Sequence, residues 1–123
     1  MNTRTAMNSR TQCKLVVEAI EALKGQNIVE LDVRKLTDLT DYMIIASGRS
    51  RRQVIAIAEN VIQAAKNVGI RPLGSEGEET GDWVLVDLVD VVVHIMEPQT
   101  RDYFQLEKLW TGHESLTESQ TGS

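Results

Sequence analysis

With 123 residues, the chain is long enough to bury a core as a single domain without disulfide or metal support. Its 13 basic and 18 acidic residues give a net charge of −5, which excludes the strongly basic footprint of a nucleic-acid-binding domain, so we expect little direct nucleic-acid binding. No uninterrupted apolar run reaches about 18 residues, so the sequence predicts no membrane span and no membrane partner.

A polar arm over residues 1–11 and a helix from Gln12 to Lys24 are the first predicted segments. The arm lacks the apolar run of a secretory signal, and neither it nor the polar tail over 111–123 has enough apolar area to offset the entropy lost on ordering, so we expect both ends to be disordered. Apolar residues recur in the helix at three- and four-residue spacing, and Gly25 is expected to end it with a positive φ angle. The single cysteine, Cys13, excludes an internal disulfide and fits a reducing cytoplasm, where we expect the protein to act.

Two strands and the longest helix are predicted next. In Ile28–Val33, the apolar residues Val29, Leu31 and Val33 alternate with Ile28, Glu30 and Asp32, which predicts a strand. Tyr42–Ala46 is a short apolar run that predicts a buried strand. Ser50 and Gln53 have the capping-box spacing at the start of a helix predicted over Arg51–Val68. This helix needs a sheet to pack against, because its apolar residues form one continuous stripe: Val54, Ala58, Val61, Ala65 and Val68.

The second half of the chain predicts three strands, Leu73–Glu76, Trp83–Asp87 and Val91–Met96. The last of them is nearly continuous in apolar residues, which is typical of a central strand. Pro98 suits the first position of a final helix, whose apolar residues are Tyr103, Phe104, Leu106, Leu109 and Trp110. The order of elements predicts an α/β domain over residues 12–110, with a mixed sheet of about five strands flanked by helices.

Charge is distributed unevenly along this domain. The segment from Pro72 to Thr100 has no lysine or arginine, but it has seven acidic residues: Glu76, Glu78, Glu79, Asp82, Asp87, Asp90 and Glu97. This asymmetry indicates an acidic face that attracts a basic partner. A solvated sheet edge with acidic turns is the alternative.

Residue types that could carry chemistry are sparse. The turn Ser47–Ser50 leads a strand into a helix N-terminus, as in anion sites and in nucleotidyltransferase active sites. Nucleotidyl transfer also needs paired carboxylates for magnesium, and the candidates Asp87 and Asp90 are three residues apart across a predicted turn. His94 has no second metal ligand near it in sequence. We therefore expect no catalytic residue, no metal and no cofactor.

A binding surface is the better interpretation. Strand alternation places Trp83, Leu85 and Asp87 on one face, and in the next strand His94 and Met96 share a face. Three helices are too few to cover both faces of the sheet, and a half-covered apolar face rimmed by charge is typical of a protein interface, where tryptophan is often the anchor. The alternative is that Trp83 fills the core beneath a helix.

Three segments of the chain resemble one family. Asp41–Ser50 resembles its pattern "D-x-x-[IV]-I-x-[ST]-G-x-S", Gly74–Asp87 its "G-x-E-G … W-[IV]-x-x-D" centre, and Asp90–Trp110 its "D-[VI]-[VI]-V-H" and "Y-x-L-E-x-L-W" close. The family is that of the ribosomal silencing factors, also called Iojap-like, and the match covers about Gln12 to Trp110. One departure is Tyr103-Phe104-Gln105-Leu106, in which Tyr and Leu are one residue further apart than in the family pattern.

The resemblance implies a fold related to nucleotidyltransferases but without their catalytic carboxylates. It also implies a protein that binds large-subunit ribosomal protein L fourteen, blocks subunit joining when nutrients are scarce, and forms homodimers off the ribosome. Combined with strand alternation, it suggests that an acidic group speeds the encounter (Glu76, Glu78, Asp82 and Asp87), that an apolar group gives residence time (Trp83, Leu85 and Met96), and that His94 forms a hydrogen bond across the contact. A nucleotidyltransferase-like enzyme and a generic dimeric interaction module remain the alternatives.

Overall fold

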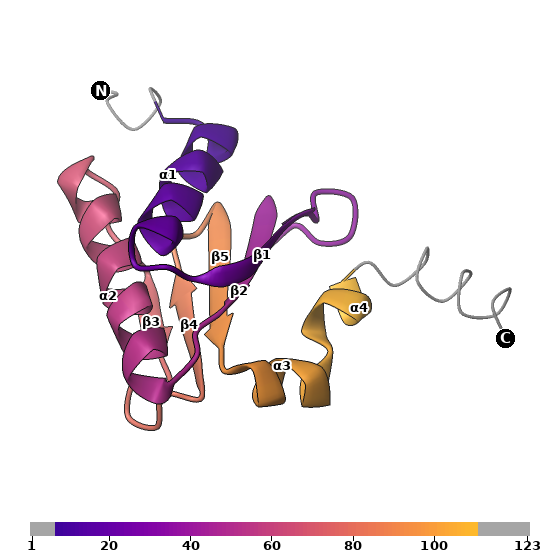
Figure 1. The fold of residues 1–123 in the computed structure, drawn as a ribbon. Helices are drawn as coiled ribbons and strands as arrows, with labels where there is room; N and C mark the ends of the chain where they lie inside the picture. The colour runs from indigo at the N-terminus through magenta and orange to yellow at the C-terminus, as the bar shows by residue number, and fades with distance from the viewer. Residues whose placement is uncertain (1–6, 111–123) are drawn as a thin grey trace, which may run out of the picture.

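In the computed structural model, which describes residues 7–110, a five-stranded sheet separates two layers of helices (Figure 1). The strand order is β1-β2-β5-β4-β3, and only the pair of β2 with β5 is parallel, so the predicted mixed sheet is confirmed. In chain order the strands are β1 (Gln26–Asp32), β2 (Tyr42–Ser47), β3 (Gly74–Glu76), β4 (Trp83–Asp87) and β5 (Val91–Met96). The apolar strand β5 is central, as predicted.

Two long helices, α1 (Ser9–Ala22) and α2 (Arg51–Asn67), pack on one face of the sheet (Figure 1). We call it the helix face. The main hydrophobic core lies there because alternate residues of the central strands point toward the helices. Its fully buried side chains include Val16, Ile20, Val54, Ile57, Val61, Val84, Val86, Val93 and Ile95. Each such aliphatic side chain contributes roughly 1.5–3 kcal/mol through removal from water.

The start of α2 is capped and is also tied to the end of α1. The Ser50 Oγ atom accepts a hydrogen bond from the Gln53 backbone N–H at 3.1 Å, as the spacing of these residues predicted. The Gln53 Oε1 atom accepts from the Arg49 N–H at 2.5 Å, one residue earlier than a capping box requires, and its Nε2 donates to the Leu23 carbonyl at 3.0 Å. One side chain therefore satisfies backbone groups of two helices.

Helix α1 differs at both ends from the prediction. It begins at Ser9, after the Asn8 side chain accepts a hydrogen bond from the Thr11 N–H at 2.8 Å, so residues 9–11 of the predicted arm are helical. The residues 1–6 of that arm and the predicted tail over 111–123 lie outside the described residues. Lys24, not Gly25, has the positive φ of 66° after the helix. Gly25 is required instead by close packing, because a Cβ atom there would lie 2.3 Å from Ile20 Cγ2.

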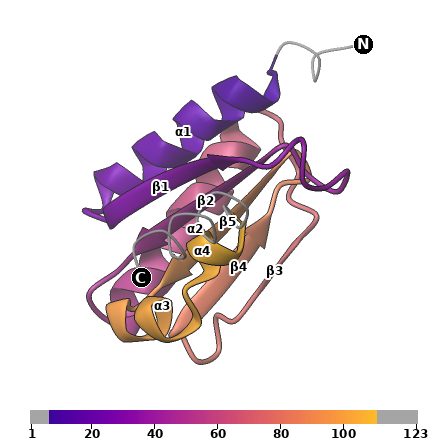
Figure 2. The same cartoon turned by 90° about the vertical axis from the view of Figure 1, so that its right-hand side faces the viewer.

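The predicted final helix is two short helices, α3 (Pro98–Phe104) and α4 (Leu106–Trp110), which lie against the sheet face opposite α1 and α2 (Figure 2). Pro98 begins α3, as predicted. Gln105, with a left-handed φ of 51°, separates the two helices and turns α4 back over the sheet. A second, smaller core forms beneath α4 from Val33, Met43, Ile45 and Met96, with Leu31, Trp83 and Leu106 packed against it.

Two further details refine the helix predictions. Val68, expected in the apolar stripe of α2, follows the helix and is 43% exposed, while Ile57 takes a place in the core. Within residues 7–110, none of the helices has the length and apolar character needed to cross a membrane.

Candidate partner-binding face

The sheet register places six of the eight predicted contact residues on one face. Directly paired residues point to the same side of a sheet. Trp83 pairs with Met96, Leu85 with His94, and Glu76 with Leu85. Asp87 is two residues after Leu85 in β4, so its side chain lies on the same side of the sheet. All these residues lie on the face opposite α1 and α2, which we call the open face. Its predicted members are Glu76, Trp83, Leu85, Asp87, His94 and Met96.

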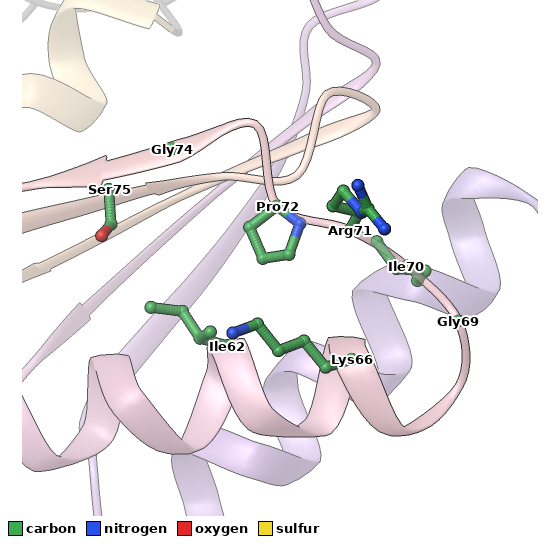
Figure 3. Close-up of a pocket in the computed structure, with 8 residues that line it drawn as sticks. All are labelled: Ile62, Lys66, Gly69, Ile70, Arg71, Pro72, Gly74 and Ser75. Atoms are coloured by element: carbon green, nitrogen blue, oxygen red, sulfur yellow. The ribbon is translucent and has the colours of Figure 1, made fainter.

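Glu78 and Asp82 do not join this group. Glu78 accepts a hydrogen bond from the Ser75 hydroxyl at 2.5 Å, and Ser75 pairs with Val86, whose side chain belongs to the helix face. Figure 3 shows the Ser75 hydroxyl directed toward α2. Asp82 lies in the bend before β4, outside the strand pairing that defines the open face. Its carboxylate accepts from the Thr80 hydroxyl at 2.7 Å, and this hydrogen bond lowers the pKa of Asp82.

The apolar centre of the open face is partly covered. Met96 has no exposed surface and belongs to the smaller core under Leu106 of α4. His94 is 5% exposed, whereas Trp83 and Leu85 are partly exposed. Met96 is therefore a core residue in this structure, and Trp83 and Leu85 are the predicted apolar contacts that a partner can reach.

Trp83 and His94 are bonded to each other. The Trp83 indole N–H donates to His94 Nδ1 at 3.0 Å, and the two ring centroids are 5.8 Å apart. Burial lowers the pKa of His94 from 6.5 to about 4, so the imidazole is neutral at pH 7. From its sequence position, His94 is expected to form a hydrogen bond across an interface, but its Nδ1 atom accepts a hydrogen bond within the chain. The Trp83 ring also contacts Phe104 of α3, with ring centroids 4.9 Å apart and a tilt of 50° between the planes. Trp83 is therefore partly packed beneath a helix, as the core interpretation expects, and its role in an interface stays a prediction.

Arg101 is a structural residue of this region that sequence reasoning missed. It is 8% exposed, and its Nη1 atom donates to the Ser47 hydroxyl at 2.9 Å. Its Nε and Nη2 atoms donate to both Glu107 carboxylate oxygens, at 3.0 and 3.1 Å. Arg101 thereby joins the end of β2 to α3 and α4. Helical spacing did not predict this role of Arg101, because Arg101 and Glu107 are six residues apart and can pair only if the helix breaks between them.

The residues considered for nucleotidyl transfer lie at opposite ends of the central strands. Gly48 bonds to the Met96 carbonyl at the carboxyl end of β5, whereas Asp87 pairs with Val92, four residues or about 13 Å away along that strand. Asp87 accepts a hydrogen bond from the Val89 N–H at 2.8 Å, so its carboxylate caps a turn. The α2 N-terminus and these carboxylates therefore do not form one site.

The Cys13 thiol and a surface hollow are the other places where a reaction or a small ligand could be expected. Burial raises the pKa of the Cys13 thiol from 9.0 to about 12, which keeps it in the weakly nucleophilic protonated form. A hollow of about 690 Å³ lies between α2 and the segment that leads into β3 (Figure 3). Its lining includes Ile62, Lys66, Pro72 and Ser75, and it contains none of the eight predicted contact residues. Within residues 7–110, no group of three or more His, Cys, Asp or Glu side chains is arranged to hold a metal ion.

Comparison with known proteins shows the family of the chain. The family model described as ribosomal silencing factor during starvation matches residues 6–122 of the chain. A ribosomal silencing factor from Chromobacterium violaceum is 54% identical over 99 residues, which are 80% of this chain and 81% of that protein. One from Haemophilus influenzae is 46% identical over 97 residues, which are 79% of this chain and 95% of that protein.

Solved structures extend the similarity to the fold. The crystal structure of a Chromobacterium violaceum protein, 50% identical, matches with a TM-score of 0.85 over 87% of this chain and 89% of that chain. Family model, sequence relatives and solved structure therefore agree with the motif resemblance. The chain belongs to the ribosomal silencing factor family.

Proposed function

We propose that this protein binds large-subunit ribosomal protein L fourteen through its open face and so prevents the small subunit from docking. It acts in the bacterial cytoplasm by occupying a surface, not by catalysis, and it lowers translation when nutrients are limited. Off the ribosome it forms a homodimer. The observation that supports this proposal best is a sheet face that is partly apolar, only partly covered by α3 and α4, and acidic at its edge.

Charge favours a basic protein as the partner. Glu76 and Asp87 lie on the open face, and the whole segment from Pro72 to Thr100 has no lysine or arginine. A basic surface is therefore drawn toward this face before contact, which raises the association rate. The partly exposed Trp83 and Leu85 then provide apolar area, which lengthens the residence time. A domain of about 100 residues bound across a subunit interface excludes a second large body by volume alone.

A subunit-joining experiment tests the proposal. Purified large and small ribosomal subunits are mixed at a magnesium concentration that favours joining, with and without an excess of the protein, and are separated on a sucrose gradient. We expect the protein to travel with the large subunit and the joined peak to fall as protein is added. Normal joining at a saturating excess of the protein would refute the proposed function.

Reducing the charge of the open face is expected to slow binding. In the variant Glu76→Gln/Asp87→Asn two negative charges are lost, while asparagine keeps an oxygen that can accept the turn hydrogen bond at position 87. We expect association with large subunits to be about threefold slower at low salt, and the difference to shrink as salt rises. Stopped-flow measurements over a range of salt concentrations check this.

The matched control is Glu18→Gln/Glu59→Gln, which changes the net charge equally but at exposed positions of α1 and α2. If both double variants slow association to the same extent, then net charge matters and the open face does not.

A further inference from the structure

We propose that the accessible apolar anchor of the docking surface is the pair Tyr103 and Phe104 on α3, held in place by Trp83, and that it receives a basic protein surface. The inference rests on the proposed function and deepens it. It moves the main contact from the strands, where sequence alternation placed it, to the short helix that covers their ends (Figure 2).

Four aromatic rings form a continuous row from the sheet centre to the surface. The centroids of His94 and Trp83 are 5.8 Å apart, those of Trp83 and Phe104 are 4.9 Å apart, and those of Phe104 and Tyr103 are 4.9 Å apart with an edge-to-face angle of 88°. Exposure rises along the row, from 5% at His94 through a partly exposed Trp83 to 54% at Phe104 and 81% at Tyr103. The outer two rings offer large apolar area to a partner, and the inner two support them.

The position of this pair is fixed from both sides. Phe104 rests on Trp83, whose indole orientation is set by its hydrogen bond to His94. On the other side, buried Arg101 holds α3 to the Ser47 hydroxyl and to Glu107 of α4. Aromatic side chains that are ordered before binding lose little conformational entropy on contact, which is a property of interface hot spots.

The surroundings of the pair fit a cationic protein side chain. Asp102, exposed and adjacent to Tyr103 in α3, supplies negative charge. Glu97 at the start of that helix is already paired with Arg51 of α2 at 3.7 Å, so Asp102 is the carboxylate that a partner's cation would meet. An arginine or lysine of the partner could lie over an aromatic face and still pair with a carboxylate, and aromatic rings attract cations through their π faces. Arg101, the basic residue of α3, is buried and bonded to Glu107, so it does not oppose such a partner at the surface.

Single alanine variants test the inference. We expect Tyr103→Ala and Phe104→Ala each to weaken binding to purified large subunits by about tenfold, as truncation of an anchor does. Tyr103→Phe, which keeps the ring, should stay within about twofold of the unmodified protein. The controls are Leu23→Ala and Val68→Ala, which remove exposed apolar side chains at the ends of α1 and α2 and should leave affinity unchanged. Circular dichroism establishes that each variant is folded, and Tyr103 is exposed enough for its loss to leave the fold intact.

The outcomes separate the two proposals. If the unmodified protein does not bind large subunits, the proposed function fails and this inference fails with it. If the unmodified protein binds and both alanine variants bind equally well, only this inference fails. The same holds if the variants lose self-association, measured by analytical ultracentrifugation, but bind the large subunit normally, because the pair would then serve a second copy of the chain.

Discussion

Between pH 7 and pH 4, the unmodified protein is expected to lose about 3 kcal/mol of its free energy of unfolding that a His94→Gln variant does not lose. Burial lowers the pKa of His94 from 6.5 to about 4 in the folded protein. Between these values the unfolded chain binds a proton that the folded chain does not, so acid favours unfolding. The stabilisation is fully present above pH 6.5 and is lost as the pH falls from 6.5 toward 4. Urea unfolding at several pH values measures it.

Glutamine is a suitable replacement, because its side-chain oxygen can still accept the Trp83 N–H and it does not titrate. The other histidine of the chain, His113, lies outside the described residues and provides the control His113→Gln. Hydrogen bonds from Arg34 lower the pKa of Asp32 from 3.8 to about 2, so protonation of this carboxylate removes stability only below about pH 4, and it does so equally in all three proteins. Parallel stability curves for the unmodified protein and His94→Gln would show that burial of His94 is not linked to folding.

The second large effect is expected at the ion pair that holds α3 and α4. Glu107→Met leaves the Arg101 guanidinium, 8% exposed, without its two carboxylate contacts, and we expect a loss of about 2 kcal/mol of unfolding free energy. Losses of about 3 kcal/mol or more are typical when both partners are deeply buried. Glu107 is about one-third exposed, which reduces the value here.

The double variant Arg101→Met/Glu107→Met is a further test, because it also removes the guanidinium charge that Glu107→Met leaves unpaired with Glu107. We expect it to recover more than half of the loss, since apolar side chains of similar length can replace a buried pair. Thermal and urea unfolding of Arg101→Met, Glu107→Met and the double variant give a complete double-mutant cycle. A double variant less stable than Glu107→Met would mean that the bond from Arg101 to Ser47 contributes more than the ion pair does.

Much of the sheet could be predicted from the sequence because alternation within a strand is a local property. The residue sets on β4 and β5 that were expected to share a face do so, with Leu85 opposite His94 and Trp83 opposite Met96. Grouping acidic residues by their closeness in the sequence was less successful. Glu78 and Asp82 lie in and after the turn at Gly77–Gly81, and the path of that turn directs Glu78 back to Ser75. The path of a turn depends on tertiary contacts, which cannot be predicted from the alternation of side chains along a strand.

The position of α4 over the smaller core could not be predicted because it depends on one backbone conformation. The residues from Pro98 to Trp110 read as a continuous helix, without glycine or a second proline to mark a break. Gln105 nevertheless adopts a left-handed conformation, an arrangement that non-glycine residues rarely take. Leu106 then packs on the smaller core that Val33, Met43, Ile45 and Met96 form. Which part of the open face α4 covers follows from this single residue.

The parallel pairing of β2 with β5 has a consequence for synthesis of the chain. Strand β2 is buried along its whole length, and its partner β5 follows only after α2, β3 and β4. While the nascent chain emerges, β1 and β2 can pair as neighbours, but the other edge of β2 keeps its amide and carbonyl groups unpaired until Met96 has left the exit tunnel. Exposed apolar strand edges are where newly made chains aggregate. The interval between emergence of Ser47 and emergence of Met96 from the tunnel is therefore the period in which one apolar edge of β2 is open to pairing with another chain.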